Sequence, residues 1–190
     1  MRSFPAFLAL VLTLAVSALL GAEPPAPARE SAAAREQARL CERLNLAAGA
    51  EACRAALALG IGPERRAAVR AQLARHLVAL EDWDALADHF RDGVRLDPQD
   101  ALGWQRLGLT LLFALHQAKE AVSALEEAVR LAPADAEARV GLAQGLAADG
   151  RTGEAALAFE AALRLDPTLL DGRPAARAAF EAARAGASWP

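Results

Sequence analysis

The sequence is poor in the residues that build β-sheets. It has no tyrosine, a single isoleucine, eight valines and four threonines among its 190 residues, and aromatic side chains make up 5% of the chain. β-Branched and aromatic side chains are the ones enriched in strands. This shortage essentially excludes a β-sandwich or a β-barrel and argues against an α/β sheet.

The chain also has no excess of basic over acidic residues. The chain carries 21 basic and 24 acidic residues, a net charge of −3, and Lys119 is its one lysine. Proteins that bind the phosphates of nucleic acid need an excess of basic side chains on the binding surface. We therefore expect no nucleic-acid partner.

Alanine is what the chain has in excess. Its 51 alanines supply about half of the 54% hydrophobic fraction, so large apolar side chains are fewer than that fraction suggests. Alanine, leucine, arginine and glutamate dominate the sequence, and all four are good helix formers. The composition predicts an all-α protein, either one compact domain or a short array of repeats.

The first 28 residues differ from the rest. Arg2 precedes an apolar run of about 17 residues, 4–20, and a proline-rich polar stretch follows over 23–30. This is the layout of a secretory signal peptide, and the Ala-Pro-Ala sequence at 26–28 predicts cleavage directly after it. We expect residues 1–28 to direct export to the periplasm or the exterior. The alternative is an uncleaved anchor in the inner membrane, since the run reaches the lower limit for a membrane span.

Two cysteines, Cys41 and Cys53, are an even number, which in an exported chain indicates a disulfide. The segments 30–44 and 50–59 are predicted helices on either side of a turn near residue 47. In an antiparallel hairpin, cysteines six residues from the turn on each side face each other. We expect a disulfide that staples this hairpin.

Asn45 and Gly49 suit the tight turn that this hairpin requires. A second interpretation makes Cys41 and Cys53 a thiol redox pair. Their spacing is not that of a Cys-x-x-Cys motif, and no histidine or third cysteine lies near enough in sequence to complete a zinc site. The structural interpretation is therefore favoured.

A sequence motif recurs in the middle of the chain. Arg-Leu-x-Pro begins at Arg95, Arg130 and Arg164, with spacings of 35 and 34 residues. Small residues and large apolar residues recur between the motifs, at Trp104, Leu107, Gly108, Leu111, Ala121, Leu125, Ala128 and Pro133 in one copy and at Leu142, Ala143, Leu146, Ala155, Phe159, Ala162 and Pro167 in the next. In both period and residues the chain resembles the tetratricopeptide-repeat family.

The resemblance implies a helix–turn–helix repeat solenoid, a superhelix with a C-terminal capping helix. Leu86 and Gly93 depart from the pattern in the first unit, because alanine is usual at both positions. The expected organisation is a degenerate disulfide-stapled hairpin at 29–66, three units at 67–100, 101–135 and 136–169 (together 67–169), a capping helix at 170–185 and a tail at 186–190 that ends in Trp189-Pro190.

Nothing in the sequence groups residues for chemistry. His76, His89 and His116 are the only histidines and stand at no metal-binding spacing, and no hydroxyl residue lies in a Gly-x-Ser-x-Gly context. No glycine-rich stretch has the form of a phosphate loop. We expect no catalytic residue, no metal and no cofactor.

The resemblance instead implies binding by the concave face, which the first helix of each unit forms. The expected contact residues on that face are Arg75, Val78, Gln105, Arg106, Leu109, Phe113, Val140 and Gln144. Leu109 and Phe113 are four residues apart and so share one face of a helix. They predict an apolar channel for an extended peptide or a partner helix. The alternative is a shallow neutral groove, in which Leu112 and part of Phe113 pack between helices.

The sequence thus predicts an exported protein–protein interaction scaffold with a protein or peptide partner. A narrower alternative is an accessory factor of an envelope assembly machine, for outer-membrane insertion, pilus assembly or cytochrome maturation. Some relatives clamp the carboxylates of chaperone tails between basic side chains. The matching positions here provide Arg75 and Arg106 but also Glu137, which would repel such a ligand, so no clamp is expected.

Overall fold

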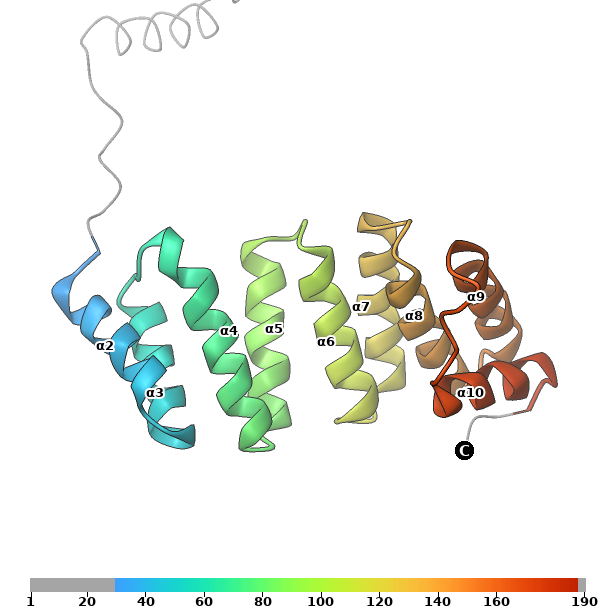
Figure 1. The fold of residues 1–190 in the computed structure, drawn as a ribbon, viewed down its shortest axis with the longest axis horizontal. Coiled ribbons are helices and arrows are strands. Elements are labelled where there is room, and N and C mark those ends of the chain that lie inside the picture. Colours follow the sequence, from blue (N-terminus) through green and yellow to red (C-terminus); the bar gives the residue numbers. More distant parts are fainter. Residues whose placement is uncertain (1–29, 188–190) are drawn as a thin grey trace, which may run out of the picture.

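The computed structural model describes residues 30–187, and within this part of the chain the structure is helices joined by short turns. The predicted all-α repeat fold is confirmed. The helices follow one another along a row (Figure 1) as α2 (Ala32–Arg43), α3 (Leu46–Ala58), α4 (Pro63–Ala79), α5 (Trp83–Leu96), α6 (Ala101–Phe113), α7 (Ala118–Leu131), α8 (Ala136–Ala148), α9 (Thr152–Leu165) and α10 (Pro174–Arg184).

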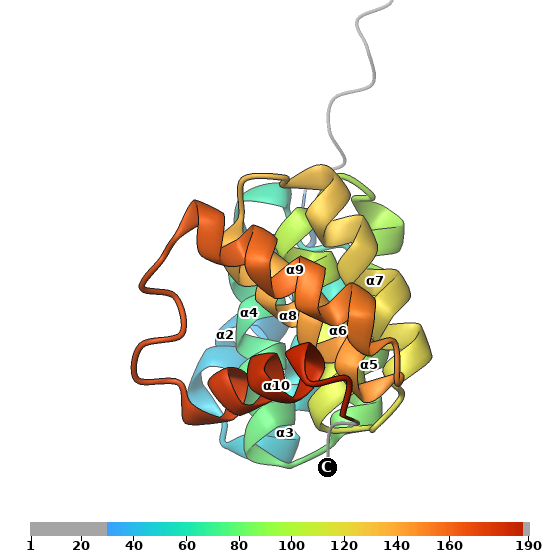
Figure 2. The same ribbon diagram turned by 90° about the vertical axis from the view of Figure 1, so that its right-hand side faces the viewer.

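The helices pair into successive antiparallel hairpins. α2 packs on α3, α6 on α7 and α8 on α9, and each hairpin contacts the next one along the row. The end-on view in Figure 2 separates α5 and α7 on one side of the row from α2 and α4 on the other. The first helices of the hairpins thus form one face of the array, and α10 extends that face at its C-terminal end by packing on both α8 and α9.

Local sequence explains where the helices begin and end. α5, α7 and α9 each end two residues before the proline of the Arg-Leu-x-Pro motif, since a proline disfavours helical backbone in the residue before it. Asp100 and Asp135 then begin α6 and α8: their carboxylates accept hydrogen bonds from the N–H groups of Gly103, at 2.9 Å, and Ala138, at 3.1 Å.

The hydrophobic core is divided along the array. One cluster joins α2, α3 and α4 and includes Leu86 of α5, and the next begins with Ala87 and joins α5, α6 and α7. Two further clusters lie mainly among α8, α9 and α10, with Val122 of α7 in one of them. Because Leu86 and Ala87 are adjacent, α5 is the wall between the first two clusters.

The hairpin of α4 and α5 is the loosest of the array, since its two helices approach each other less closely than those of the other hairpins. Leu86, at the position of Ala121 and Ala155 in later hairpins, is 4% exposed and holds α5 away from α4. Gly93, at the second departure from the repeat, faces an arginine: a Cβ there would lie 2.6 Å from Nη2 of Arg70. Both departures from the repeat therefore have a structural consequence.

The first turn lies earlier than predicted. α2 ends at Arg43 and α3 begins at Leu46, so Gly49 lies inside α3 rather than in the turn. The reason is close packing, because a Cβ on Gly49 would lie 2.6 Å from ring atoms of His76. α4 likewise begins at Pro63, four residues before the expected start of the first unit.

No helix within residues 30–187 is both long and apolar enough to cross a membrane. The predicted signal peptide or anchor, residues 1–28, and the terminal Trp189 lie outside the described residues.

Candidate functional site

Two hollows on the face formed by the first helices meet at α6. The central hollow, of about 530 Å³, lies between α4, α5 and α6, and the C-terminal hollow, of about 360 Å³, lies between α6, α8 and α10. Leu109 and Phe113 of α6 line both hollows and form the ridge between them. Phe113 is 53% exposed although it is a large apolar side chain.

The structure brings most of the predicted contact residues to these hollows. Val78 and Arg106 line the central hollow beside the ridge, and Gln105 and Gln144 line the C-terminal one. Arg75 lines neither hollow and instead donates a 3.1 Å hydrogen bond to Gln72 on its own helix. Arg106 forms no ion pair within the described part of the chain.

One predicted contact residue of the groove, Val140, is buried. Val140 is 4% exposed and packs in the core cluster with Phe159 and Leu170, because the loop before α10 and α10 itself cover it. It forms the floor of the C-terminal hollow rather than an accessible contact. Leu112 is also buried, as the alternative interpretation expected, whereas Phe113 is not. The apolar surface available to a partner is therefore centred on α6.

Glu137 does not stand as an isolated negative charge on this face. Arg173, directly before α10, donates to both carboxylate oxygens of Glu137, with Nη1–Oε2 at 2.6 Å and Nη2–Oε1 at 2.5 Å. The hydrogen bond to Glu137 raises the pKa of Arg173 above its ordinary value. The expected repulsion of an acidic partner by Glu137 is therefore largely cancelled, because the carboxylate already has a partner.

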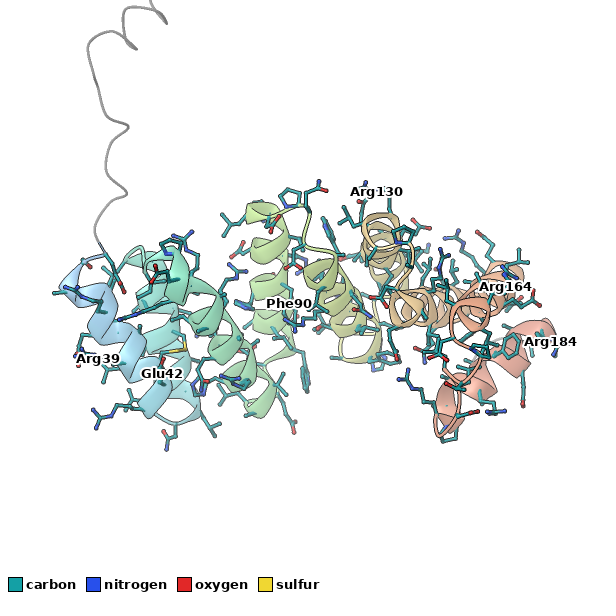
Figure 3. The ribbon with its side chains drawn as sticks, turned by 45° about the horizontal axis from the view of Figure 1, so that its top comes forward. Arg39, Glu42, Phe90, Arg130, Arg164 and Arg184 are labelled. Atoms are coloured by element: carbon teal, nitrogen blue, oxygen red, sulfur yellow. A yellow bond between two sulfur atoms is a disulfide. The ribbon has the colours of Figure 1, made fainter. Side chains whose placement is uncertain are left out.

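Sequence reasoning missed the walls that complete the hollows. The aromatic side chains of Trp83 and Phe90, on α5, line the central hollow, and Pro174 and Ala175, on α10, line the other. The repeat pattern places Trp83 in the turn between the helices and Phe90 in the second helix, and predicts that both pack inside the unit. They reach the first-helix face because the α4/α5 hairpin is open. Phe90 lies near the middle of the array in Figure 3.

At the N-terminal end, the Sγ atoms of Cys41 and Cys53 are bonded, and the two Cα atoms are 4.7 Å apart (Figure 3). Both cysteines are 0% exposed. His76 of α4, 7% exposed, donates from Nε2 to the carbonyl of Cys41 at 3.0 Å. This contact fixes the stapled hairpin on the helix that follows it.

Within residues 30–187, no three histidine, cysteine or acidic side chains are grouped closely enough to hold a metal ion. The ion pairs among these residues lie at the surface, where such pairs contribute little to stability. The features of the first-helix face are thus shape, apolar area and the charge of Arg106.

The architecture defines an all-α helix–turn–helix repeat protein. Solved structures identify the fold as that of the tetratricopeptide-repeat proteins. YrrB, described as a tetratricopeptide-repeat protein with an unusual peptide-binding site, has a TM-score of 0.62 and 24% identity, over 91% of this chain and 81% of its own. MamA from Desulfovibrio magneticus RS-1, residues 41 to the end, has a TM-score of 0.59 and 23% identity, over 83% and 92% of the two chains.

Yeast Sti1 provides another similar structure. Its TPR2B domain, in complex with pHsp70, has a TM-score of 0.52 and 19% identity, over 59% of this chain and 90% of its own. No protein-family model matches the chain, and the search of curated proteins found no match. The likeness to these structures therefore establishes the fold.

Proposed function

We propose that the protein is an interaction scaffold that binds an extended peptide or a partner helix on its first-helix face, without turnover. The observation that carries the proposal is the ridge of Leu109 and Phe113 between two hollows, with Phe113 53% exposed. A large aromatic side chain that is solvent-exposed on a hollowed face is a usual anchor for a partner. Two proteins with the same fold give further support: the TPR2B domain of Sti1 is described in complex with pHsp70, and YrrB is described as having a peptide-binding site.

The two hollows suit a partner with two apolar side chains on one edge. An extended segment presents alternate side chains to one face, and a helix presents side chains three or four residues apart. Either could seat one apolar group on each side of Leu109 and Phe113. Gln105, Gln144 and Arg106 would then orient the partner through hydrogen bonds at the rim.

We further propose that the protein acts outside the cytoplasm after removal of residues 1–28. The disulfide of Cys41 and Cys53 supports this proposal, since disulfides persist in oxidising compartments. Full burial of both sulfur-bearing residues favours a structural staple over a redox pair, which needs access for the attacking thiol. N-terminal sequencing of the protein from fractionated cells tests this: an intact N-terminus in the membrane fraction would instead support the anchor.

The binding face is tested by changing its ridge. In the variant Leu109→Ser with Phe113→Ala, we expect loss of the partners that the unchanged protein captures from an envelope extract. Phe113 is solvent-exposed and Leu109 half-buried, so the helix content and the unfolding midpoint should change little.

A matched control places the same two kinds of substitution on another face. Leu157 and Leu165 of α9 are 66% and 46% exposed and line neither hollow. The variant Leu157→Ser with Leu165→Ala should retain the captured partners. If the ridge variant stays folded and captures the same partners as the control, the proposed binding face is wrong.

A further inference from the structure

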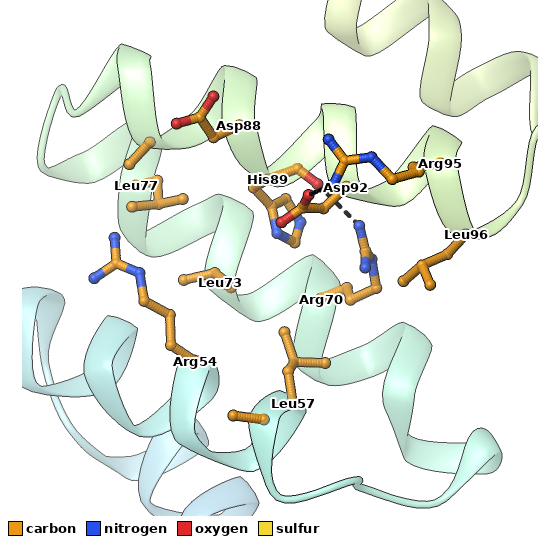
Figure 4. Close-up of a pocket in the computed structure, with 12 residues that line it drawn as sticks. Arg54, Leu57, Arg70, Leu73, Leu77, Asp88, His89, Asp92, Arg95 and Leu96 are labelled. Carbon is orange, nitrogen blue, oxygen red and sulfur yellow. Dashed lines mark hydrogen bonds and ion pairs between the residues drawn. The ribbon is translucent and has the colours of Figure 1, made fainter.

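A third pocket, of about 540 Å³, lies between α3, α4 and α5 and shares no lining residue with the two hollows (Figure 4). We call it the α3–α5 pocket. A pocket of about 810 Å³ lies at the equivalent place between α5, α6 and α7, but there Trp104 stands at the position of Arg70. The volume of the α3–α5 pocket is within the range of small-molecule sites.

The floor of the α3–α5 pocket is apolar. Leu57 of α3 and Leu73 and Leu77 of α4 line it, and Leu73 and Leu77 are also part of the N-terminal core cluster. These leucines come from helices that the stapled hairpin holds together. The floor is therefore a fixed surface on which an apolar group of a ligand could pack.

Arginines form the walls around this floor. Arg54 of α3, Arg70 of α4 and Arg95 of α5 line the pocket, and Figure 4 shows Arg54 and Arg70 on opposite sides of Leu73. Two acidic residues, Asp88 and Asp92, also line it. The electrostatic character of the pocket depends on which of these charges already have partners.

The two carboxylates of the pocket already have partners. Asp88 accepts from Arg91 at 2.9 Å, and Asp92 accepts from Arg95 at 2.8 Å. Arg54 pairs with Glu51, outside the pocket, at 2.6 Å.

Arg70 differs from these residues because it has no carboxylate within ion-pair distance in residues 30–187. Its Nη2 donates to the carbonyl of His89 at 2.9 Å, and its other donors lack a side-chain acceptor in the described structure. Arg70 is half-buried, so its charge is less screened by water than that of an exposed arginine.

His89 also lines the pocket. Burial, and secondly the charge of Arg70, lower the pKa of His89 from 6.5 to about 4. The imidazole is therefore neutral at physiological pH and adds no positive charge of its own to the pocket. The pocket combines one uncompensated guanidinium with an apolar floor.

We propose that the α3–α5 pocket binds a small amphipathic carboxylate. The carboxylate would lie against Arg70, whose planar guanidinium can donate two parallel hydrogen bonds to it, with Arg54 on the opposite wall. The hydrocarbon part would pack mainly on Leu57, with Leu73 and Leu77 closing the floor beneath it. This site is independent of the proposed binding face, because the two share no residue.

The test uses the mature chain with its disulfide intact and octanoate as the probe. We expect saturable changes in the amide NMR signals of α3, α4 and α5 and no saturable change in those of α8 and α9. Octylammonium, of the same chain length but opposite charge, should bind at least about tenfold more weakly. Equal binding of the two probes would overturn the proposal, because it would show apolar partition without recognition of the anion.

Two arginine variants locate the site. Arg139, on α8, stands at the position of Arg70 in its own unit but donates to the carbonyl of Pro133, at 2.7 Å from Nη2, and lines none of these pockets. Arg70→Met should weaken octanoate binding about tenfold or more, and Arg139→Met should leave it unchanged. Equal affinity of the two variants would overturn the assignment.

The variant Arg54→Met provides a second test in case Arg70→Met does not fold. Arg54 is an exposed wall residue with a side-chain exposure of 41%, so Arg54→Met should fold normally and still weaken octanoate binding severalfold. If neither Arg54→Met nor a folded Arg70→Met changes the affinity, the proposal is wrong. The ridge variant of Leu109 and Phe113 should bind octanoate normally, so failure of one proposal is distinguishable from failure of the other.

Discussion

The α4/α5 and α6/α7 hairpins occupy equivalent places in the repeat but pack differently. In α6/α7, Gly108 lets the helices touch: a Cβ there would lie 2.5 Å from Cγ of Leu125 and 3.2 Å from the carbonyl of Ala121. In α4/α5, Leu86 replaces the small residue of the repeat. Arg70 lies between the two helices and donates to the carbonyl of His89. The difference teaches that the alanine and glycine positions set the distance between helices, and that two changes are enough to open a hairpin.

The same contrast appears at the fourth position of the first helices. Trp104 and Arg139 both donate to the carbonyl of the proline that closes the preceding unit, at 3.1 Å for Trp104 Nε1. Arg70 has no such proline before it and donates to the carbonyl of His89 within its own hairpin. One position therefore links neighbouring units at α6 and α8, and links the two helices of a single hairpin at α4.

The largest predicted effect is the loss of stability when a phenylalanine is replaced by alanine, compared at equivalent positions of two hairpins. Phe159 is 0% exposed in the closed α8/α9 hairpin, whereas Phe90 is half-buried in the open one. Phe159→Ala should lower the free energy of unfolding by about 4 kcal/mol, and Phe90→Ala by about half of that. Urea denaturation measures both, and equal losses would contradict the contrast between open and closed hairpins.

Removal of the disulfide should weaken the N-terminal end of the array. For the variant Cys41→Ser with Cys53→Ser, the chain-entropy model gives a loss of roughly 3 kcal/mol. Since α4 packs more closely on α3 than on α5, the loss should appear in the amide hydrogen exchange of α2, α3 and α4. Unchanged protection of α8 and α9 is the internal control; an equal loss there would mean that the open hairpin does not separate the two ends.

Replacing either of two glycines by alanine should change the stability less, and in different directions. Gly108→Ala forces a contact with backbone and with a buried leucine, so it should destabilise the protein by about 2 kcal/mol despite the better helix propensity of alanine. At Gly93, the nearest group to a new Cβ is the flexible end of Arg70. Gly93→Ala should therefore be neutral or stabilising by up to about 1 kcal/mol, and thermal unfolding can compare the two.

The smallest effect is a pH dependence of the open hairpin. The pKa of His89 is about 4 in the folded protein and 6.5 as the ordinary value, so between these limits the unfolded state binds more protons. The stability contributed by neutral His89 is present above pH 6.5 and is lost as the pH falls towards 4. After allowance for partial exposure, the loss should be about 1 kcal/mol.

The measurement is the difference in unfolding free energy between the wild type and His89→Gln from pH 7 to pH 4, since other groups cancel in it. His116→Gln is the control, because His116 is exposed in a turn. If this difference in unfolding free energy does not change between pH 7 and pH 4, water reaches His89 between α4 and α5 and the prediction is wrong. Ala124 occupies the equivalent position of α7, so the closed hairpin has no counterpart of this effect.

Much of this architecture could be predicted from the sequence, because period and helix-ending prolines are local signals. The helical repeats and the ridge of Leu109 and Phe113 follow from residue spacing. Gly49 was assigned to a turn, since its contact with His76 depends on residues 27 apart in the chain.

The walls of the site could not be predicted in the same way. Phe90 reaches the central hollow only because Leu86 opens the hairpin, and Arg173 neutralises Glu137 from 36 residues away. Leu86 and Gly93 are recognisable in the sequence as departures from the repeat, but the looser packing of α4 on α5 is not. Such outcomes depend on distances between helices, which the repeat pattern alone does not specify.

The boundary between the first two core clusters has a consequence for how the array could be lengthened. Leu86 faces the stapled end of the molecule, and Ala87, one residue later, faces a surface of the kind that later units present to one another. A duplicated copy of residues 101–135 inserted after residue 135 would meet complementary neighbours on both sides. The same copy inserted between α3 and α4 would lose the contact of His76 with Cys41. The array thus accepts a further unit between α7 and α8 but not between α3 and α4.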